Sequence, residues 1–204
     1  MRLATMLTAV VLAAPLGGCG YNRIQALDEQ VEQTRANVGV RLTERNQLIP
    51  NLVATVKGAA EFERGTFTEV ARARAGQLAA AEQGLQQAGQ QVQAAVEGQD
   101  VERMQAADAQ VTRSIGTYLN LAVEAYPNLR ATQNFQGLQD QLSESETKIA
   151  TARQDYNEAV RTYNTYIRQF PQAITAKVTG ADRKEPYRAP AGSETAPTVD
   201  FSQP

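Results

Sequence analysis

The chain has 204 residues, is 42% hydrophobic and only 6% aromatic, and carries a formal net charge of −2. This length suits one ordinary domain with tails, and the small charge argues against the clustered basic surface that nucleic-acid binding requires. The sequence has no His and a single Cys, Cys19. An intrachain disulfide is therefore excluded, as are a zinc site of the thiolate–imidazole type and a His general base.

Residues 1–18 have the layout of a secretory signal peptide, because Arg2 precedes an apolar run from Leu3 to Ala14 and small residues follow. The run would span about 18 Å as a helix, too short for a hydrocarbon core of about 30 Å. The stretch Leu16–Cys19 resembles the lipobox of bacterial lipoproteins, which predicts cleavage before Cys19 and acylation of its thiol and of the new amino terminus. The alternative is a buried or incidental Cys. An acylated protein would be held at the periplasmic face of an envelope membrane, and the lack of Asp after Cys19 resembles lipoproteins sorted to the outer membrane.

After the signal peptide, apolar residues recur at spacings of three, four and seven, which predicts a long amphipathic helix. Its stripe comprises Ile24, Leu27, Val31, Val38, Leu42, Leu48, Leu52, Val56 and Ala59. Pro50 interrupts the stripe, and because proline cannot donate a backbone hydrogen bond, we expect a kink or a restart there. A second helix is predicted over residues 67–93; Gly84, Gly89 and Gly98 weaken its far end, where we expect fraying and a turn near Gly98.

Asp100 is a candidate cap for a third helix, whose stripe runs from Val101 to Ala125. This helix should end at Tyr126, because Pro127 disfavours helical geometry in the residue before it. Thr132 or Asn134 then starts a fourth helix with the near-heptad apolar spacing of a coiled coil.

The fourth helix should end at Pro171, and residues 179–204 form a Pro-rich tail that is predicted to be extended or disordered. Short connections between amphipathic helices favour antiparallel packing. The sequence therefore predicts an all-α protein, an antiparallel up-down-up-down four-helix bundle over residues 19–178 with long first and fourth helices.

Several blocks resemble the LemA family, in order, from Tyr21-Asn22 to Phe201: "RNQLIPNLVATVKGAAEFE", "VARARA", "EAYPNLRATQNFQGLQDQL", "ESETKIATARQDYNEAVRTYNTYIRQFP" and "APTVDF". The resemblance implies a four-helix protein of the bacterial envelope with no established enzymatic role, and a connection with membrane proteases and envelope maintenance. The lipobox departs from the uncleaved apolar span that is commoner in the family. Tyr187 stands near where the family tends to place Phe, which leaves the docking of the tail open.

Two Tyr-Asn pairs, Tyr156-Asn157 and Tyr163-Asn164, lie seven residues apart and therefore on one helix face. One interpretation makes the Asn side chains a polar ladder for a partner or a glycan. The other packs both Tyr rings into the bundle, where their hydroxyl groups need partners and help to fix helix register. We favour packing.

Arg45 lies near the first apolar stripe, with Arg41 one turn before it. These residues could form an anion pocket, but we favour an ion pair of Arg45 with a carboxylate such as Glu124 or Glu146, because a buried charge is tolerated when it is paired. The structural candidates are Arg45, Pro50, Glu124, Tyr126, Pro127, Arg153, Tyr156, Asn157, Tyr163 and Asn164.

Acidic residues could bind a cation at Glu61, Glu63 and Glu69, or at Glu144 with Glu146, although solvated helix faces are the favoured interpretation. The di-iron arrangement of helical bundles needs His. A Walker loop, a nucleophile elbow and a dinucleotide fingerprint are also missing. We predict no catalytic, cofactor-binding or metal-binding residue.

The function predicted from these observations is a non-enzymatic envelope lipoprotein, a helical scaffold or adaptor anchored through Cys19 that presents its sides and its tail to envelope proteins. One alternative is a membrane-remodelling or lipid-contacting protein that uses an exposed apolar helix face. A second alternative is a carrier with an enclosed apolar cavity for a small ligand.

Overall fold

A computed structural model describes residues 2–62 and 69–188, with side chains described for 20–61 and 75–188. The described residues form helices and no strand, so the predicted all-α class is confirmed. In chain order the elements are α1 (Arg2–Asn46), α2 (Leu48–Phe62), α3 (Glu69–Glu97), α4 (Val101–Ala125), the 3-10 helix η2 (Pro127–Ala131), α5 (Gln133–Tyr166) and α6 (Gln172–Thr179). Residues 63–68, which include the predicted start of the second helix, lie outside the described residues.

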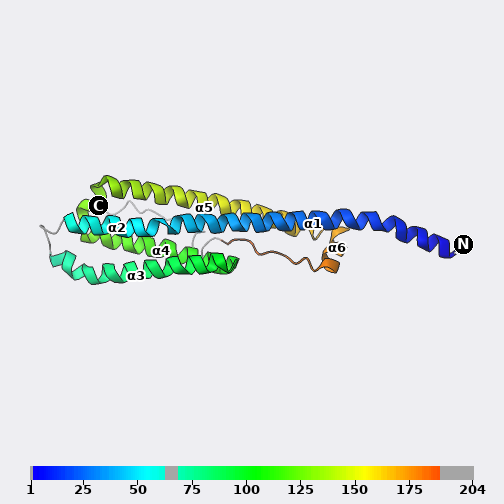
Figure 1. Ribbon diagram of the computed structural model, residues 1–204, viewed down its shortest axis with the longest axis horizontal. Helices are drawn as coiled ribbons and strands as arrows, with labels where there is room; N and C mark the ends of the chain where they lie inside the picture. Colours follow the sequence, from blue (N-terminus) through cyan, green and yellow to red (C-terminus); the bar gives the residue numbers. More distant parts are fainter. Residues whose placement is uncertain (1, 63–68, 189–204) are drawn as a thin grey trace, which may run out of the picture.

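Helices α1 and α2 continue along nearly the same line and are separated at Gln47 (Figure 1). The cause is Pro50, three residues further on. Proline has no N–H to offer the carbonyl of Asn46, and its ring crowds that carbonyl, so the helix is interrupted on the amino-terminal side of the proline. The predicted break near Pro50 is confirmed.

Helix α3 runs to Glu97, and the predicted fraying from about residue 84 is wrong. Burial of Leu85, Ala88, Val92 and Ala95 outweighs the low helix propensity of glycine. Gly89 also permits a close approach of α3 to α1, because a Cβ atom there would lie 2.5 Å from the side-chain oxygen of Asn46. The turn near Gly98 is confirmed.

Helix α4 begins after Asp100, whose carboxylate accepts a hydrogen bond from the backbone N–H of Arg103 at 3.0 Å. It ends before Tyr126, and Pro127 opens η2. Thr132 is the residue before α5, so both predicted boundaries hold. Helix α5 ends at Tyr166, earlier than the predicted stop at Pro171, because the chain turns before the proline.

Helix α6 and the course of the chain after it were not predicted, although the lack of regular structure after Gly180 was. Helix α6 follows Pro171, and Gly180 ends it in the left-handed conformation with φ of 69°. Residues 181–188, which we call the strap, have no regular secondary structure and run back along the rod towards α4 (Figure 1). The remaining tail, 189–204, lies outside the described residues.

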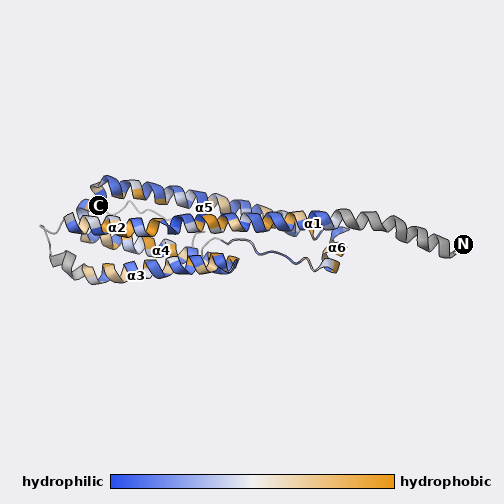
Figure 2. Ribbon diagram, viewed as in Figure 1, coloured by the Kyte–Doolittle hydropathy of each residue, from blue (hydrophilic) through white to orange (hydrophobic). Residues whose placement is uncertain are grey.

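The molecule has two parts of different thickness (Figure 1). In the wide half, α3, α4 and residues 133–156 of α5 lie beside residues 35–62 of α1 and α2. In the narrow half, residues 20–34 of α1 and 157–166 of α5 continue past the α3–α4 turn and are accompanied by α6 and the strap. Hydrophobic and hydrophilic residues alternate along the helices of both halves (Figure 2), and one connected core of buried residues extends from Ile24 to Val56 along α1 and α2.

Candidate functional site

Asn157 and Asn164 of α5 hold the strap through its backbone, and we call these two residues the asparagine clamp. The side-chain amide of Asn164 donates to the carbonyl of Lys184 at 2.8 Å and accepts from its N–H at 2.9 Å. Asn157 makes the same pair of bonds with Tyr187, at 2.9 and 2.7 Å. Each amide therefore satisfies one complete residue of an extended chain.

The spacing of the clamp matches the geometry of an extended peptide. Seven residues of helix rise about 10.5 Å, and three residues of extended chain, from Lys184 to Tyr187, span about 10 Å. An extended chain with no neighbouring strand leaves its N–H and C=O groups without partners. The two Asn side chains supply those partners, which explains the Tyr-Asn repeat at a period of seven.

The tyrosines of the repeat are buried and support the same contact. Tyr156 donates from its hydroxyl to the carbonyl of Glu185 at 2.9 Å, and Lys184 lies over the ring of Tyr163, 5.9 Å from its centroid. Burial raises the pKa of both tyrosines. The repeat thus packs within the protein and also forms a polar ladder, whose occupant is the strap of the same chain.

Lys184 joins the strap to α1 as well. Its ammonium group lies 2.9 Å from the carboxylate of Asp28 and 3.3 Å from that of Glu32. Burial alone would lower the pKa of Lys184, but the hydrogen bonds and negative charges of the two carboxylates outweigh it, and the pKa is raised. The strap therefore ties α1 and α5 together along the narrow half.

The strap ends at a set of charged groups that we call the ion cluster: Arg45, Asp108, Glu146, Arg153 and Tyr187. Asp108 is 2% exposed and forms an ion pair with Arg45 at 2.8 Å. Its carboxylate accepts hydrogen bonds from Arg153 and, at 3.0 Å, from the Tyr187 hydroxyl. Arg45 is fully buried and also lies 2.7 Å from Glu146. The cluster joins α1, α4, α5 and the strap at one point.

Tyr187 is held on two sides within the ion cluster. The guanidinium of Arg153 lies over its ring, 5.1 Å from the centroid. Burial raises the pKa of Tyr187 above its ordinary value of 10.0, and the nearby charge of Asp108 adds to this effect, whereas Arg153 opposes it. The hydroxyl group therefore remains a donor to Asp108 throughout the neutral pH range.

The structure places Arg45 against Glu146, one of the two carboxylates considered, but not against Glu124. Glu124 is an exposed residue sixteen positions beyond Asp108 on α4, a distance of about 24 Å along the helix. Sequence reasoning missed Asp108, the central acceptor. The signal was present: Asp108 falls four residues after Met104 and three before Val111, within the third apolar stripe, where a lone carboxylate implies a cationic partner.

Of the other predicted residues, three lie at helix boundaries, and the side chain of Cys19 is not described. Pro50, Tyr126 and Pro127 mark helix boundaries, and Tyr126 is buried. Cys19 lies in α1, but its side chain is outside those described.

Among the acidic candidates for a cation site, the side chains of Glu63 and Glu69 are outside the described set. Glu144 lies 2.8 Å from Lys148, whose hydrogen bond lowers the pKa of that carboxylate. Within the described residues no group of three or more metal-ligating side chains comes together, and no helix there combines the length and apolar character of a membrane span.

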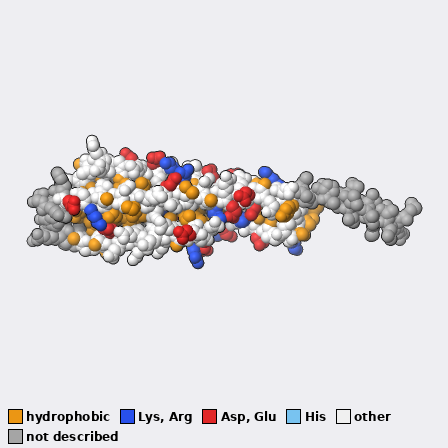
Figure 3. Space-filling model, in the orientation of Figure 1, with side chains coloured by type: hydrophobic (Ala, Val, Ile, Leu, Met, Phe, Trp, Pro, Cys, Tyr) orange, Lys and Arg blue, Asp and Glu red, His pale blue; other side chains and the backbone are white. Residues whose placement is uncertain are grey.

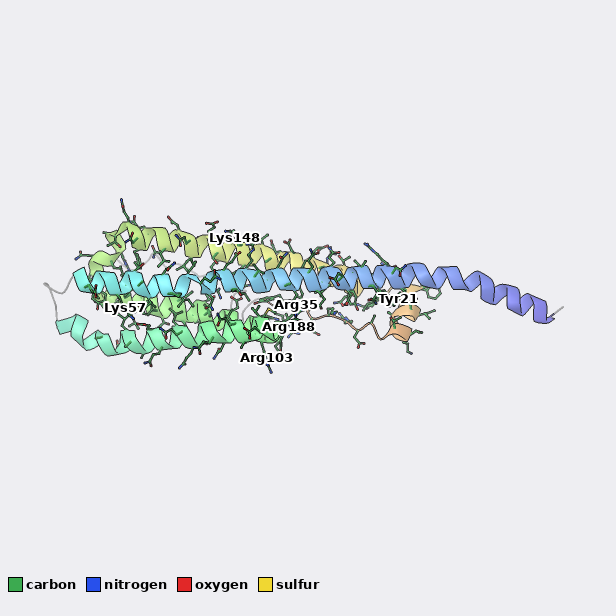
Figure 4. The ribbon with its side chains drawn as sticks, viewed as in Figure 1. Tyr21, Arg35, Lys57, Arg103, Lys148 and Arg188 are labelled. Carbon is green, nitrogen blue, oxygen red and sulfur yellow. The ribbon has the colours of Figure 1, made fainter. Side chains whose placement is uncertain are left out.

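A hollow of about 400 Å³ lies between α1 and the α3–α4 turn. Gly39, Val96 and Met104 line its apolar side, whereas Arg35 and Glu44 lie at its polar side. Figure 4 places Arg35 near Arg103 and Arg188, at the level where α3 turns into α4. The clamp differs from this hollow because its polar groups are aligned with a peptide backbone. Chemically, the clamp recognises an extended peptide, and the ion cluster fixes the end of that peptide.

The sequence matches known proteins along most of its length. Magnetosome proteins MamQ 2 and MamQ 1 of Paramagnetospirillum magneticum (strain ATCC 700264 / AMB-1) are each 28% identical to it over 192 residues, which cover 90% of this chain and 70% of theirs. Magnetosome protein MamQ of Magnetospirillum gryphiswaldense is 25% identical over the same shares. A sequence model described as LemA family matches residues 34–201, including every residue of the clamp and of the ion cluster. The chain belongs to the LemA family.

Proposed function

We propose that this protein is a non-enzymatic lipoprotein of the bacterial cell envelope, in which lipidated Cys19 holds a helical rod at the periplasmic face of a membrane. The rod presents its sides and its Pro-rich tail to envelope proteins as a scaffold or adaptor. The family resemblance suggests a membrane protease system as one kind of partner.

The observation that carries this proposal is the position of the lipobox-like stretch. Leu16–Cys19 directly precedes Gly20, which packs against α6, and α1 runs on past α6 at this end of the rod (Figure 1). Acylation there would hold the rod by one end and leave its length accessible. A single acyl chain gives only marginal binding, whereas two or more give stable anchoring.

The arrangement of the helices supports a role in presentation. We interpret α1 with α2, α3, α4 and α5 as an up-down-up-down four-helix bundle, counting α1 and α2 as one interrupted helix. The clamp and the ion cluster fix the strap as far as Arg188, which lies beside the α3–α4 turn (Figure 4). A tail fixed at its base on a rigid rod is suited to contacting partners.

The anchor is tested by labelling cells that express the full chain with a clickable palmitate analogue. We expect acylation of the wild-type protein and its recovery with membranes, and no label on a Cys19→Ser variant. A Ser114→Cys variant, which retains Cys19, should be labelled like the wild type. A wild-type protein that is processed but carries no acyl chain would overturn the proposal.

The scaffold role is tested by in-cell crosslinking from the tail, with a photoreactive residue in place of Phe201, followed by mass spectrometry. We expect one or a few envelope proteins in every replicate. The matched control places the same residue at Asp140, which is exposed near the far end of α5. Only lipid-processing enzymes, or no reproducible partner, would contradict the scaffold role.

A further inference from the structure

Helix α6 and the turn before it expose three large apolar side chains. Phe170 is 83% exposed, Ile174 58% and Val178 81%. Ile174 and Val178, four residues apart within α6, lie on one face of that helix, and Phe170 belongs to the turn that precedes it. We call these three residues the apolar ridge. Exposing these side chains to water is costly, because removal of large apolar surface from water is favourable.

The exposed face is not the one that attaches α6 to the protein. Ala176, on another face, is buried. A Cβ atom at Gly20 of α1 would lie 3.6 Å from the Thr175 hydroxyl and 3.9 Å from the Gln172 side chain. Helix α6 therefore packs on α1 through these small and polar residues and turns its large apolar residues outward.

The ridge lies at the end of the rod from which the leader emerges. Tyr21, which is 43% exposed, lies beside α6 in Figure 4, only two residues after Cys19. The opposite end of the rod, near Lys57, lies far from this position (Figure 4). Hydrophobic atoms are visible at the α6 end of the described surface in Figure 3.

The chain segment that carries the ridge contains charges of one sign only. Residues 167–181 include Arg168 and Lys177 and no Asp or Glu. A short amphipathic helix with basic and large apolar residues fits the interface of a membrane that contains anionic lipid, where apolar burial and electrostatic attraction act together. A groove for a protein partner would be expected to combine the ridge with neighbouring concave surface, and the hollow beside Val40 lies along α1 in the wide half instead.

We infer that the apolar ridge inserts into the headgroup region of the membrane to which the protein is tethered, so that α6 lies along the surface as a second contact. This inference rests on the proposed tether at Cys19. Its consequence is orientational. A rod held only by flexible acyl chains could tilt freely, whereas a rod held also by α6 has a fixed angle to the membrane and presents its strap and tail at a fixed height.

The test uses the mature acylated protein, in which the thioether blocks Cys19, so that an introduced Cys is the only free thiol. Ile174→Cys carries an environment-sensitive fluorophore, and the matched control carries it at Val40→Cys, where the native side chain is 51% exposed. Both proteins are reconstituted into phosphatidylethanolamine vesicles with and without phosphatidylglycerol. We expect a blue shift and quenching by brominated lipid at position 174 and neither at position 40, with the larger effect on anionic vesicles.

Two further measurements separate the possible failures. Adding Phe170→Ser and Val178→Ser to the position-174 probe should abolish its blue shift, while flotation with vesicles, which reports the tether, stays unchanged. If the protein floats with the vesicles but the probe at position 174 remains in water, the proposed insertion of the ridge is wrong and the proposed tether stands. A blue shift without lipid quenching identifies a protein contact and also overturns the ridge. Failure of the acylated protein to float overturns both proposals.

Discussion

The wide and narrow halves of the rod bury similar apolar stripes by different means. In the wide half, α3 and α4 cover α1 and α5, and helices satisfy their own backbone hydrogen bonds. In the narrow half no second helical hairpin is present among the described residues, and the strap covers part of the same stripes. An extended chain brings unsatisfied backbone groups with it, so this half needs Asn157 and Asn164, which the wide half does not.

The comparison shows why the two kinds of polar contact differ in charge. The clamp consists of neutral amide groups that bind only backbone N–H and C=O groups. It can therefore position an extended peptide whatever the side chains of that peptide are. The ion cluster is charged and involves Arg45, Asp108 and Arg153, whose geometry fixes which helices meet and at which level. Tyr187 belongs to both sites, because its backbone is held by Asn157 and its hydroxyl by Asp108. The two halves are therefore coupled through one residue of the strap.

The largest effect is expected from Asp108→Ala, which removes the acceptor shared by both halves. Arg45 would remain buried with only Glu146 as a charged partner, and Tyr187 would lose its acceptor. Removing one partner of a buried ion pair typically costs about 3–5 kcal/mol, and we expect a loss of that size in the free energy of unfolding, measured by urea denaturation. The control is Asp155→Ala at an exposed position of α5. Equal stability of the two variants would show that the cluster contributes little.

Arg45→Ala tests the wide half more directly and should cost less, about 1–3 kcal/mol. Asp108 keeps Arg153 and the Tyr187 hydroxyl as partners in this variant, so no fully isolated buried charge results. The double variant Arg45→Ala with Asp108→Ala should be more stable than the sum of the single effects predicts, since the two residues interact. An unchanged melting temperature for Arg45→Ala would contradict the importance of its burial.

The clamp should affect the narrow half alone. Asn164→Ala removes two hydrogen bonds to Lys184, each worth about 0.5–1.5 kcal/mol, and we expect the strap to open while the wide half keeps its stability. Hydrogen exchange measures this directly: the amide of Lys184 should exchange faster, whereas amides of α4 should not change. The exposed amide at Gln154 supplies the control, Gln154→Ala. Uniform acceleration across α4 and the strap would mean that the halves do not open separately.

Sequence reasoning anticipated the wide half better than the narrow one for a physical reason. Helical periodicity records which residues are buried, so the stripes, the break near Pro50 and the cap at Asp100 could be read locally. The strap has no periodicity, and its contacts with the helices include residue pairs that lie 20 and 152 positions apart. The repeat of Tyr156-Asn157 and Tyr163-Asn164 was visible, but its occupant was not. From the sequence one can infer that a partly buried Asn side chain needs a hydrogen-bond partner, but not which group supplies it.

The smallest effect concerns alkaline pH and again separates the strap from the rest. Unfolded tyrosine releases its proton near 10.0, whereas burial raises the pKa of Tyr187, Tyr156 and Tyr163 in the folded protein. Above 10.0 the folded state therefore binds more protons than the unfolded state, and stability falls as the pH rises. The raised pKa of Lys184 acts in the same direction above its ordinary value of 10.5.

Replacing Tyr187 by Phe should reduce this loss, because the side chain that is most strongly shifted within the strap no longer titrates. The cost at neutral pH is one hydrogen bond to Asp108, about 1 kcal/mol. The measurement is the free energy of urea unfolding at pH 8 and at about pH 11, where free tyrosine is mostly ionised. Tyr21→Phe, at an exposed position, is the control and should leave the pH dependence as it is in the wild type. If Tyr187→Phe retains the full alkaline loss, the effect comes from Lys184 or from tyrosines of the helices, and Tyr187 does not make the strap sensitive to pH.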